Sequence, residues 1–309
     1  RNPIAALKYP KELDAKPPRF YTSEELSALY CASPYHWHWW KLMANTGLRR
    51  AEALNLKWEN IVDDVVYIAA SDELFAYTPD FRLIDSWRNP YLKHCHEIDV
   101  WEGNLFLTST GYDSILAFDL ARKQFHWALY IETEDFKFKG TVYNPRDKDG
   151  PLQLNKLHIN NVCCREAGMY ITGLRSGGML HFNGKHVRMA VELPKGTHNA
   201  QPFRDGVLFN DTEADLLRYT GRGEGEEDRS LRVPKFEVNQ LTHTDVDTSK
   251  LARQGYARGL CVVNHRIVAA GSSPSTVSLY DLKGSKRLMS VTLTMDIRNA
   301  IHGLEIWPF

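Results

Sequence analysis

One unit of alternating strands recurs along the chain, and this repetition restricts the possible folds more than any other feature. Each copy begins with a short starter segment, continues into an alternating strand and ends in a second strand followed by a turn. The four complete copies are HEIDVWEGNLFLTSTGYDSILAFDL from His96, HINNVCCREAGMYITGLRSGGMLHFNG from His158, HNAQPFRDGVLFNDTEADLLRYTG from His198 and ARGLCVVNHRIVAAGSSPSTVSLYDL from Ala257. A unit this small cannot bury a core by itself, so neighbouring copies are expected to pack against each other.

A fifth copy is divided between the two ends of the repeat region. The stretch DDVVYIAASDELFAYTPDF, residues 63 to 81, has no starter, whereas the chain ends on a bare starter, HGLEIWPF from His302. A radial array of small sheets must close, because otherwise its first and last sheets expose edge strands. The region from 62 to 309 resembles the β-propeller superfamily. We therefore expect a mainly β chain that forms a five-bladed β-propeller closed by the C-terminal strand.

Two polar inserts lengthen the spacing between starters. They are ETEDFKFKGTVYNPRDKDGPLQ, between the first and second complete copies, and GRGEGEEDRSLRVPKFEVNQLTHTDVDTSK, between the third and fourth. Their charged and glycine-rich composition is typical of surface loops. We expect surface loops or additional outer strands at these two places.

Residues 1–61 follow a different pattern and are expected to form a small α-helical segment. Thr22 and Glu25 fit a capping box, Pro34 interrupts the helical pattern, and Gly47 is placed to end a second helix. The strings YTSEELSALY and NTGLRRAEALNLKWENI resemble the start of the catalytic domain of tyrosine recombinases, the phage integrases. The resemblance implies that Arg49 contacts a DNA phosphate, a role that suits the guanidinium fork.

The remainder of the recombinase pattern is missing from this chain. There is no lysine between Lys57 and Lys93, and no histidine is followed by an arginine in a His-x-x-Arg box. Only strand-rich copies occupy the region where a nucleophilic tyrosine would be needed. We therefore expect a catalytically incomplete fragment rather than an active recombinase. A structural or fusion remnant is the first interpretation, and a surviving DNA-binding role is the alternative.

Composition limits the classes of partner. The chain has 38 basic and 38 acidic residues, so no net charge attracts it to nucleic acid or to an anionic membrane. It contains no apolar run long enough to span a bilayer. The 5 cysteines fit neither a disulfide framework nor a zinc site. From these features we expect reduced thiols, a cytoplasmic location and a small-molecule substrate, with nucleic acid unfavoured and the oligomeric state left open.

The starters carry the strongest chemical signal. Four of the five begin with a histidine, and these are His96, His158, His198 and His302. Equivalent positions on successive propeller blades converge on the central axis, so the four imidazoles are expected to meet there. Imidazole binds iron, copper and zinc rather than calcium or magnesium. The predicted cofactor is a transition metal ion, with iron or copper preferred to zinc. The ligand set is similar to the four-histidine iron centre of carotenoid-cleaving oxygenases, although those enzymes have seven blades.

Three further residues are expected near the axis. Arg258 occupies the starter position that lacks a histidine, and a guanidinium there would anchor a carboxylate or a phosphate. Asp211 and Arg175 lie in turns that would rim the same pocket as substrate-binding residues. The alternative for Asp211 is that it satisfies backbone groups of its own turn.

Two functions follow from these residues. The first is a metal-dependent oxidoreductase that acts on a small anionic substrate at the four-histidine centre. The alternative is a non-catalytic binding or scaffold module, in which Trp101, Trp127 and Trp307 serve as contact surfaces and the histidines form a hydrogen-bonded structural ring. Fold alone does not choose between them.

Overall fold

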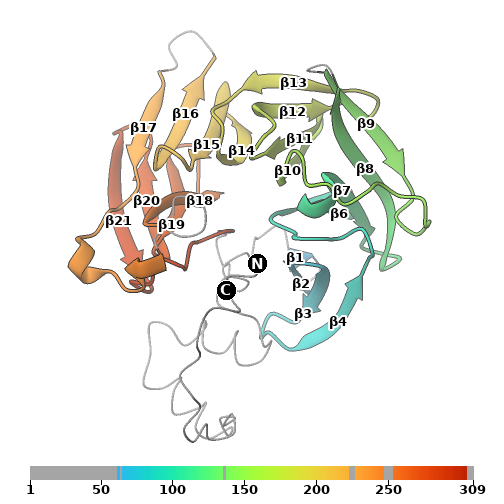
Figure 1. The fold of residues 1–309 in the computed structure, drawn as a ribbon, viewed down its shortest axis with the longest axis horizontal. Helices are drawn as coiled ribbons and strands as arrows, with labels where there is room; N and C mark the ends of the chain where they lie inside the picture. Colours follow the sequence, from blue (N-terminus) through green and yellow to red (C-terminus); the bar gives the residue numbers. More distant parts are fainter. Residues whose placement is uncertain (1–60, 63–64, 135–136, 223–226, 247–252, 305–309) are drawn as a thin grey trace, which may run out of the picture.

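The computed structural model describes residues 61–62, 65–134, 137–222, 227–246 and 253–304. The helical segment expected over residues 1–61, with Arg49, falls almost entirely outside these residues, as does Trp307. The described part forms five antiparallel sheets arranged around a common centre (Figure 1). This arrangement confirms the expected five-bladed propeller.

The first two blades come from the N-terminal half of the described chain. Blade 1 contains β1 (Ile61–Val62), β2 (Val65–Ala70), β3 (Glu73–Tyr77) and β4 (Leu83–Arg88). Blade 2 contains β5 (Ile98–Trp101), β6 (Asn104–Ser109), β7 (Ser114–Asp119), β8 (Gln124–Glu134) and β9 (Lys137–Tyr143). In each blade the strands follow one another in chain order, so every connection within a blade is a hairpin.

The other three blades repeat this order with four strands each. Blade 3 contains β10 (Ile159–Arg165), β11 (Gly168–Gly173), β12 (Gly178–Phe182) and β13 (Val187–Glu192). Blade 4 contains β14 (Thr197–Phe203), β15 (Gly206–Asp211), β16 (Leu216–Gly221) and β17 (Arg229–Arg232). Blade 5 contains β18 (Gly255–Val262), β19 (Ile267–Ser273), β20 (Thr276–Asp281) and β21 (Lys286–Thr292). Short 3-10 turns are η3 (Thr110–Tyr112), η4 (Val238–Gln240) and η5 (Thr244–Val246).

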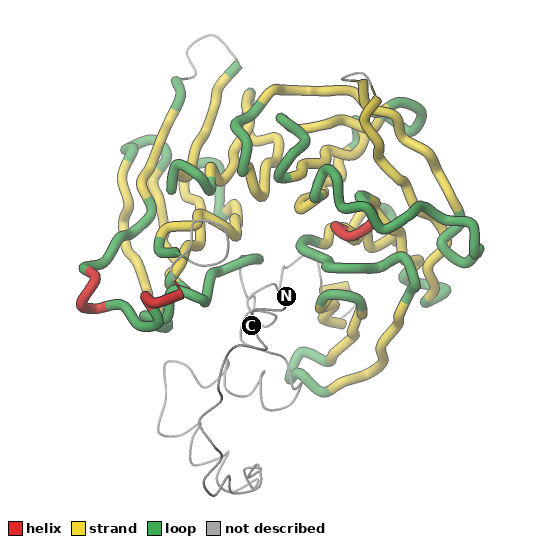
Figure 2. Tube along the Cα trace, viewed as in Figure 1, coloured by secondary structure: helices red, strands yellow, loops and turns green. Residues whose placement is uncertain are grey.

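Burial changes across a blade from the axis outward. The middle strand β7 is buried along nearly its whole length, whereas the outermost strand β21 is exposed at every residue but its last. Figure 2 shows the strands of each blade side by side, with loops joining one blade to the next. The inner strands are covered on both faces by neighbouring blades, so most of their residues are buried, including polar ones such as Asn161 and Asn199.

The hydrophobic core lies between the blades. One cluster joins blades 1 and 2 through residues such as Leu74 and Leu105, and a second joins blades 2 and 3 through Ile115 and Ile171. A third lies between blades 3 and 4, and a fourth between blades 4 and 5. Each repeat therefore completes its core on its neighbour, as expected for units too small to be stable alone.

The two inserts supply both loops and outer strands. The first insert forms β9, the fifth strand of blade 2, and then the connection to blade 3. The second forms β17 and two short 3-10 turns on the way to blade 5. The first insert thus adds an outer strand as well as a loop, whereas β17 of the second is the fourth strand that the other blades also have.

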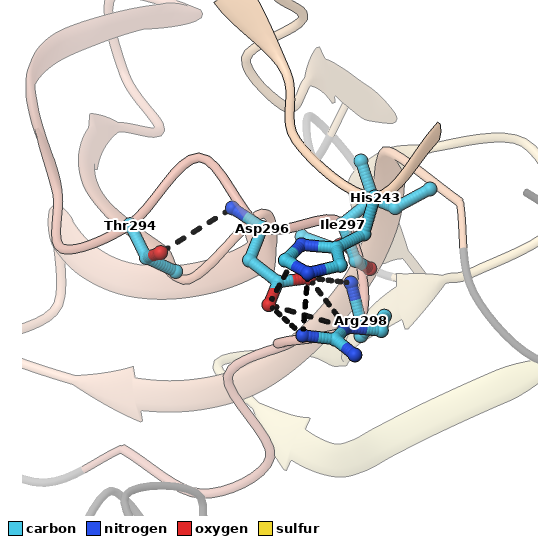
Figure 3. A network of polar contacts seen from close by, with 6 residues as sticks. His243, Thr294, Asp296, Ile297 and Arg298 are labelled. Atoms are coloured by element: carbon cyan, nitrogen blue, oxygen red, sulfur yellow. Dashed lines mark hydrogen bonds and ion pairs between the residues drawn. The ribbon is translucent and has the colours of Figure 1, made fainter. Parts of the chain in front are cut away.

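A polar clasp ties the second insert to the segment that follows β21 (Figure 3). Thr242 forms a parallel bridge with Asp296. The Asp296 carboxylate pairs with Arg298 at 2.7 Å and with His243 Nδ1 at 3.4 Å, and Arg298 also contacts His243 Nε2 at 3.1 Å. The Arg298 hydrogen bond lowers the pKa of Asp296. The clasp holds the chain where it turns back toward the axis.

The last described segment reaches the axis without joining a ladder. Up to residue 304, the described part of the chain forms no strand after β21, and in blade 1 it is Ile61 that pairs with Val66 of β2. The backbone N–H of Ile301 donates to the carbonyl of Ser272 at 3.5 Å, and a Cβ added at Gly271 would overlap the Ile301 side chain. This close approach brings His302 to the centre. Closure by a C-terminal strand rests on residues 305–309 and stays a prediction.

The described helices are all short 3-10 turns, and none could cross a membrane. Within the described part of the chain, Cys95, Cys163, Cys164 and Cys261 take part in no disulfide.

Candidate functional site

The starter residues predicted to converge do lie together at the centre of the propeller. The ring centroids of His96 and His158 are 5.3 Å apart, and those of His96 and His302 are 6.5 Å apart. Arg258 Nη1 lies 3.1 Å from His302 Nε2. His198 is close enough for Arg258, His96 and His158 all to influence its pKa. We call these five residues the axial ring.

Hydrogen bonds set the tautomer of the imidazoles. The Nδ1 atoms of His96, His198 and His302 each contact the backbone carbonyl two residues earlier, at 2.7, 3.0 and 3.2 Å. A carbonyl only accepts, so the network assigns the proton to Nδ1 in these three rings. Their Nε2 atoms therefore carry the lone pair. In the fourth ring, His158 Nδ1 lies 3.0 Å from the side-chain oxygen of Asn155.

A recurring threonine fixes two of these rings and links neighbouring blades. The hydroxyl of Thr110 lies 3.0 Å from His96 Nδ1 and donates to the carbonyl of Ile159 in blade 3. The hydroxyl of Thr212 lies 2.9 Å from His198 Nδ1 and donates to the carbonyl of Ala257 in blade 5. Each threonine thus orients its own blade's histidine against the starter of the next blade.

An aspartate three residues after each threonine completes this link. Asp113 accepts from the backbone N–H groups of Leu157 and His158 at 3.1 and 2.8 Å, and also from that of Lys156. Asp215 accepts from the N–H of Tyr256 at 3.1 Å. Sequence analysis missed these residues as site-forming groups. The repeated spacing of Thr-Gly-Tyr-Asp at 110–113 and Thr-Glu-Ala-Asp at 212–215 is the signal that identifies them.

Burial makes the ring imidazoles neutral. Desolvation lowers the pKa of His96 and of His158 to about 4 and that of His302 to about 3. His198, with 4% of its surface exposed, has a pKa lowered well below the usual value. The positive charge of Arg258 contributes to every one of these decreases. At neutral pH the ring therefore combines uncharged imidazoles with one cation.

Arg258 is the charged group of the ring. Burial lowers its pKa, but a guanidinium remains protonated at neutral pH. Its Nη1 donates to His302 Nε2, and its guanidinium carbon lies 5.2 Å from the ring centroid of Tyr256. The Nε atom is buried and has no hydrogen-bond partner in the described part of the protein. The same holds for His198 Nε2.

The metal role predicted for the four histidines remains a prediction. No group of three or more histidine, cysteine, aspartate or glutamate side chains among the described residues is arranged to hold a metal ion. The lone pair of His302 Nε2 accepts from Arg258, so this imidazole is already engaged. A cation beside the ring also opposes the binding of a second cation.

The two other predicted site residues have different positions. Arg175 is exposed and donates from Nε to the carbonyl of Lys156 at 2.6 Å, and its charge contributes to the lowered pKa of His158. It therefore lies beside the ring and holds the loop before blade 3. Asp211 is buried, accepts from the N–H of Ala214 and pairs with Arg218 at 3.3 Å. These contacts agree with the alternative role of Asp211 in its own turn.

A polar cavity continues along the inner strands beyond the ring. Its volume is about 170 Å³. Its polar lining consists of Glu97, Asp99, Asn161, Cys163, Arg165, Asn199, Gln201 and Cys261. Asn199 of blade 4 links two other blades. Its amide nitrogen donates to Glu97 of blade 2 at 3.0 Å, and its oxygen accepts from the N–H of Gly259 of blade 5 at 2.9 Å. Polar side chains therefore make up the larger part of this lining.

Comparison with known proteins identifies similar folds only. No protein-family model matches the sequence, and no curated protein matches it at a significant level. Similar solved structures include the RRP9 WD40 repeats (TM-score 0.47, 11% identity, 74% of this chain and 60% of that one) and U3-55K (TM-score 0.47, 11% identity, 74% and 61%). Another is the C-terminal WD40 domain of Sif2 (TM-score 0.46, 11% identity, 78% and 72%). The chain covers about 60% of the length of the first two.

Proposed function

We propose that this protein is a non-catalytic β-propeller binding module and that the axial ring is its ligand site. The ligand that fits is a small anion that also carries hydroxyl or N–H donors. The observation that supports this choice is the combination of one buried guanidinium with neutral imidazoles whose Nε2 atoms accept hydrogen bonds.

The unsatisfied atoms define what such a ligand must supply. Arg258 Nε is a donor and His198 Nε2 is an acceptor, and neither has a partner among the described residues. Leaving a buried polar atom unpaired costs about 1–3 kcal/mol. A carboxylate or phosphate would accept from Arg258, while a hydroxyl of the same ligand would donate to an imidazole. An anion without donors would meet the imidazole lone pairs and bind more weakly.

The ring can be reached from solvent. His96, His158 and His302 are half-buried rather than fully enclosed, and only His198 is almost completely covered. A ligand can therefore contact the exposed parts of these three rings, and it reaches the buried Arg258 Nε and His198 Nε2 only when the groups that cover them move aside.

Isothermal titration calorimetry with glycerate, inorganic phosphate and acetate tests the proposal. Glycerate carries a carboxylate and two hydroxyl groups, whereas acetate lacks the donors. We expect glycerate to bind more tightly than acetate, and Arg258→Gln to weaken glycerate binding at least about tenfold, or about 1.4 kcal/mol. Arg222→Gln is the control, because Arg222 is exposed and donates to the carbonyl of Ala190 away from the ring. Equal affinities in the parent and Arg258→Gln, or no binding of either glycerate or phosphate, would contradict the proposal.

A metal-dependent oxidoreductase is the second candidate. It is favoured by the Nδ1–H tautomer of His96, His198 and His302, because metal-binding histidines are normally held by a hydrogen bond from the other ring nitrogen. Elemental analysis separates the two candidates. About one iron or copper per chain, lost in a His158→Ala/His198→Ala double variant, would support the enzyme and replace the first proposal.

A further inference from the structure

An aromatic groove lies between blades 2 and 3, where the β5–β6 hairpin of blade 2 faces the β10–β11 hairpin of blade 3. Its volume is about 460 Å³. Trp127 forms the middle of its wall, with ring centroids 6.2 Å from Phe106 and 6.1 Å from Phe182. Glu102 and Glu166 also line the groove, one from each hairpin, and both are exposed.

The corresponding place between blades 4 and 5 already contains an arginine of this chain. Arg204 follows Phe203 in the β14–β15 hairpin, and its guanidinium carbon lies 5.4 Å from the Phe203 ring and 5.9 Å from the Tyr219 ring. Its Nε donates at 2.9 Å to the carbonyl of His265, in the β18–β19 hairpin of blade 5. A guanidinium thus covers aromatic rings of one blade and reaches the hairpin of the next.

The groove between blades 2 and 3 has a different residue type at the position of Arg204. Trp101 pairs with Asn104 as Phe203 pairs with Gly206, so Glu102 holds the hairpin position of Arg204. Both residues have positive φ angles, 47° for Glu102 and 50° for Arg204.

Aromatic rings line both places but stand at different strand positions, because Ala117 holds the register position of Tyr219 and is flanked by Phe106 and Trp127. At the hairpin a carboxylate replaces the guanidinium. The groove therefore has an aromatic surface of the kind that Arg204 covers in blade 4 and, in addition, a negative charge that attracts an arginine.

We propose that the groove between blades 2 and 3 binds an arginine-bearing segment of a partner protein. The guanidinium lies against Trp127, which provides a cation–π contact, and pairs with Glu102 and Glu166. Arg165 also lines the groove, but its Nη1 donates to the carbonyl of Cys164 at 2.6 Å, which holds its charge against its own strand. This site is separate from the axial ring and does not depend on the ligand proposed there.

Titration calorimetry of the full chain with the peptide acetyl-Ser-Arg-Ser-Arg-amide tests this inference. Peptides with lysine, leucine or glutamate in place of arginine are the comparison set. We expect the arginine peptide to bind several-fold more tightly than the lysine peptide, because a planar guanidinium stacks on an indole better than an ammonium does. Neither the leucine nor the glutamate peptide should bind.

Substitutions assign the binding to the groove. Glu102→Gln/Glu166→Gln keeps the shape of the walls and should weaken binding of the arginine peptide roughly fivefold, as expected for two partly exposed charge pairs. Trp127→Leu should weaken the binding of this peptide further. Asp205→Asn changes an exposed acid in the matching hairpin of blade 4 and should leave the affinity unchanged. Arg258→Gln should also leave it unchanged, which separates this test from that of the axial ring.

Three outcomes would overturn the inference. The charge-based site would be ruled out if the arginine peptide did not bind, or if it bound the Glu102→Gln/Glu166→Gln variant and the parent protein with equal affinity. Equal binding of the leucine peptide would show that the groove takes apolar segments instead. Self-association that Trp127→Leu abolishes would identify a second copy of this chain as the occupant.

Discussion

At the scale of residues, the axial ring shows how burial changes the chemistry of a repeated side chain. An isolated histidine titrates near neutral pH, but the ring histidines lose water and lie near Arg258. Both effects disfavour the imidazolium form, and the backbone carbonyls that accept from Nδ1 offset them only in part. The result is a set of hydrogen-bond acceptors around one cation rather than a set of charges.

The lowered pKa values predict a loss of stability in mild acid. Because each folded-state pKa lies below the unfolded value of about 6.5, the stabilisation is complete above pH 6.5. It is lost as the pH falls toward the folded values, about 4 for His96 and about 3 for His302. We expect each ring imidazole to reduce the free energy of unfolding by up to about 1.4 kcal/mol per pH unit over this interval.

Urea unfolding at pH 7.5, 6 and 5 measures this effect. A His302→Gln variant should show a smaller decrease between pH 7.5 and 5 than the parent, because one titrating group is gone. His186→Gln, at an exposed position in the turn before β13, is the control and should follow the parent. Identical pH profiles for the parent and His302→Gln would contradict the assignment.

At the scale of elements, each starter is positioned by the turn of the preceding blade. Asp113 lies in the turn between β6 and β7 of blade 2 and accepts from three consecutive backbone N–H groups just before β10 of blade 3. Hydrogen bonds to a charged acceptor are worth about 1.5–3 kcal/mol each at most, and they do not simply add. This contact sets the position of His158 more directly than any feature of its own strand.

Asp113→Ala should therefore destabilise the protein by about 2–4 kcal/mol and displace His158 from the ring. Asp113→Asn keeps one acceptor oxygen and should cost about half as much. Urea unfolding gives the energy, and NMR titration of His158 reports the position, since its pKa should rise toward 6.5 as it gains water. The opposite observation, an unchanged pKa with a large loss of stability, would mean that Asp113 stabilises the turn without positioning the histidine.

At the scale of the whole molecule, the propeller depends on contacts between parts of the chain that are distant in sequence. The core clusters join adjacent blades in sequence order, while the clasp of His243, Asp296 and Arg298 joins the second insert to the final approach to the axis. In the clasp the side chains of His243 and Arg298 are about half exposed. We therefore expect it to contribute to local order rather than to global stability.

Replacing Asp296 by Asn tests the clasp. The amide N–H groups of Thr242 and Ile297 donate to Met295 and Thr242 across this junction, and hydrogen exchange at both should become faster. The free energy of global unfolding should change by less than about 1 kcal/mol. Because the pKa of Asp296 is lowered, the carboxylate is protonated only when the pH falls through that lowered pKa, and the same local effect should then appear. Unchanged exchange in Asp296→Asn would show that the bridge alone holds the junction.

Much of the fold could be predicted from the sequence because it is a repeat. The alternation within each copy determines which residues face a neighbouring blade, and the equal register of the copies places His96, His158 and His198 at equivalent positions. The outer strands β8, β13 and β21 were not separately predicted. The strands β13 and β21 are largely exposed, so their sequences mix polar and apolar residues, whereas β8 is mostly buried or half-buried and carries an apolar run that was not assigned to a strand of its own.

The amino-acid sequence by itself determined the five repeated units and the order of side chains along each starter, because strand periodicity is a local property. Only the tertiary structure decided that Arg258 donates to His302, that the imidazoles are neutral, that Asp211 serves its own turn, and that Glu102 lines a groove with aromatic residues of blades 2 and 3. Apart from the local turn of Asp211, these features depend on desolvation and on distances between residues far apart in the chain. Such quantities exist only once the blades have packed.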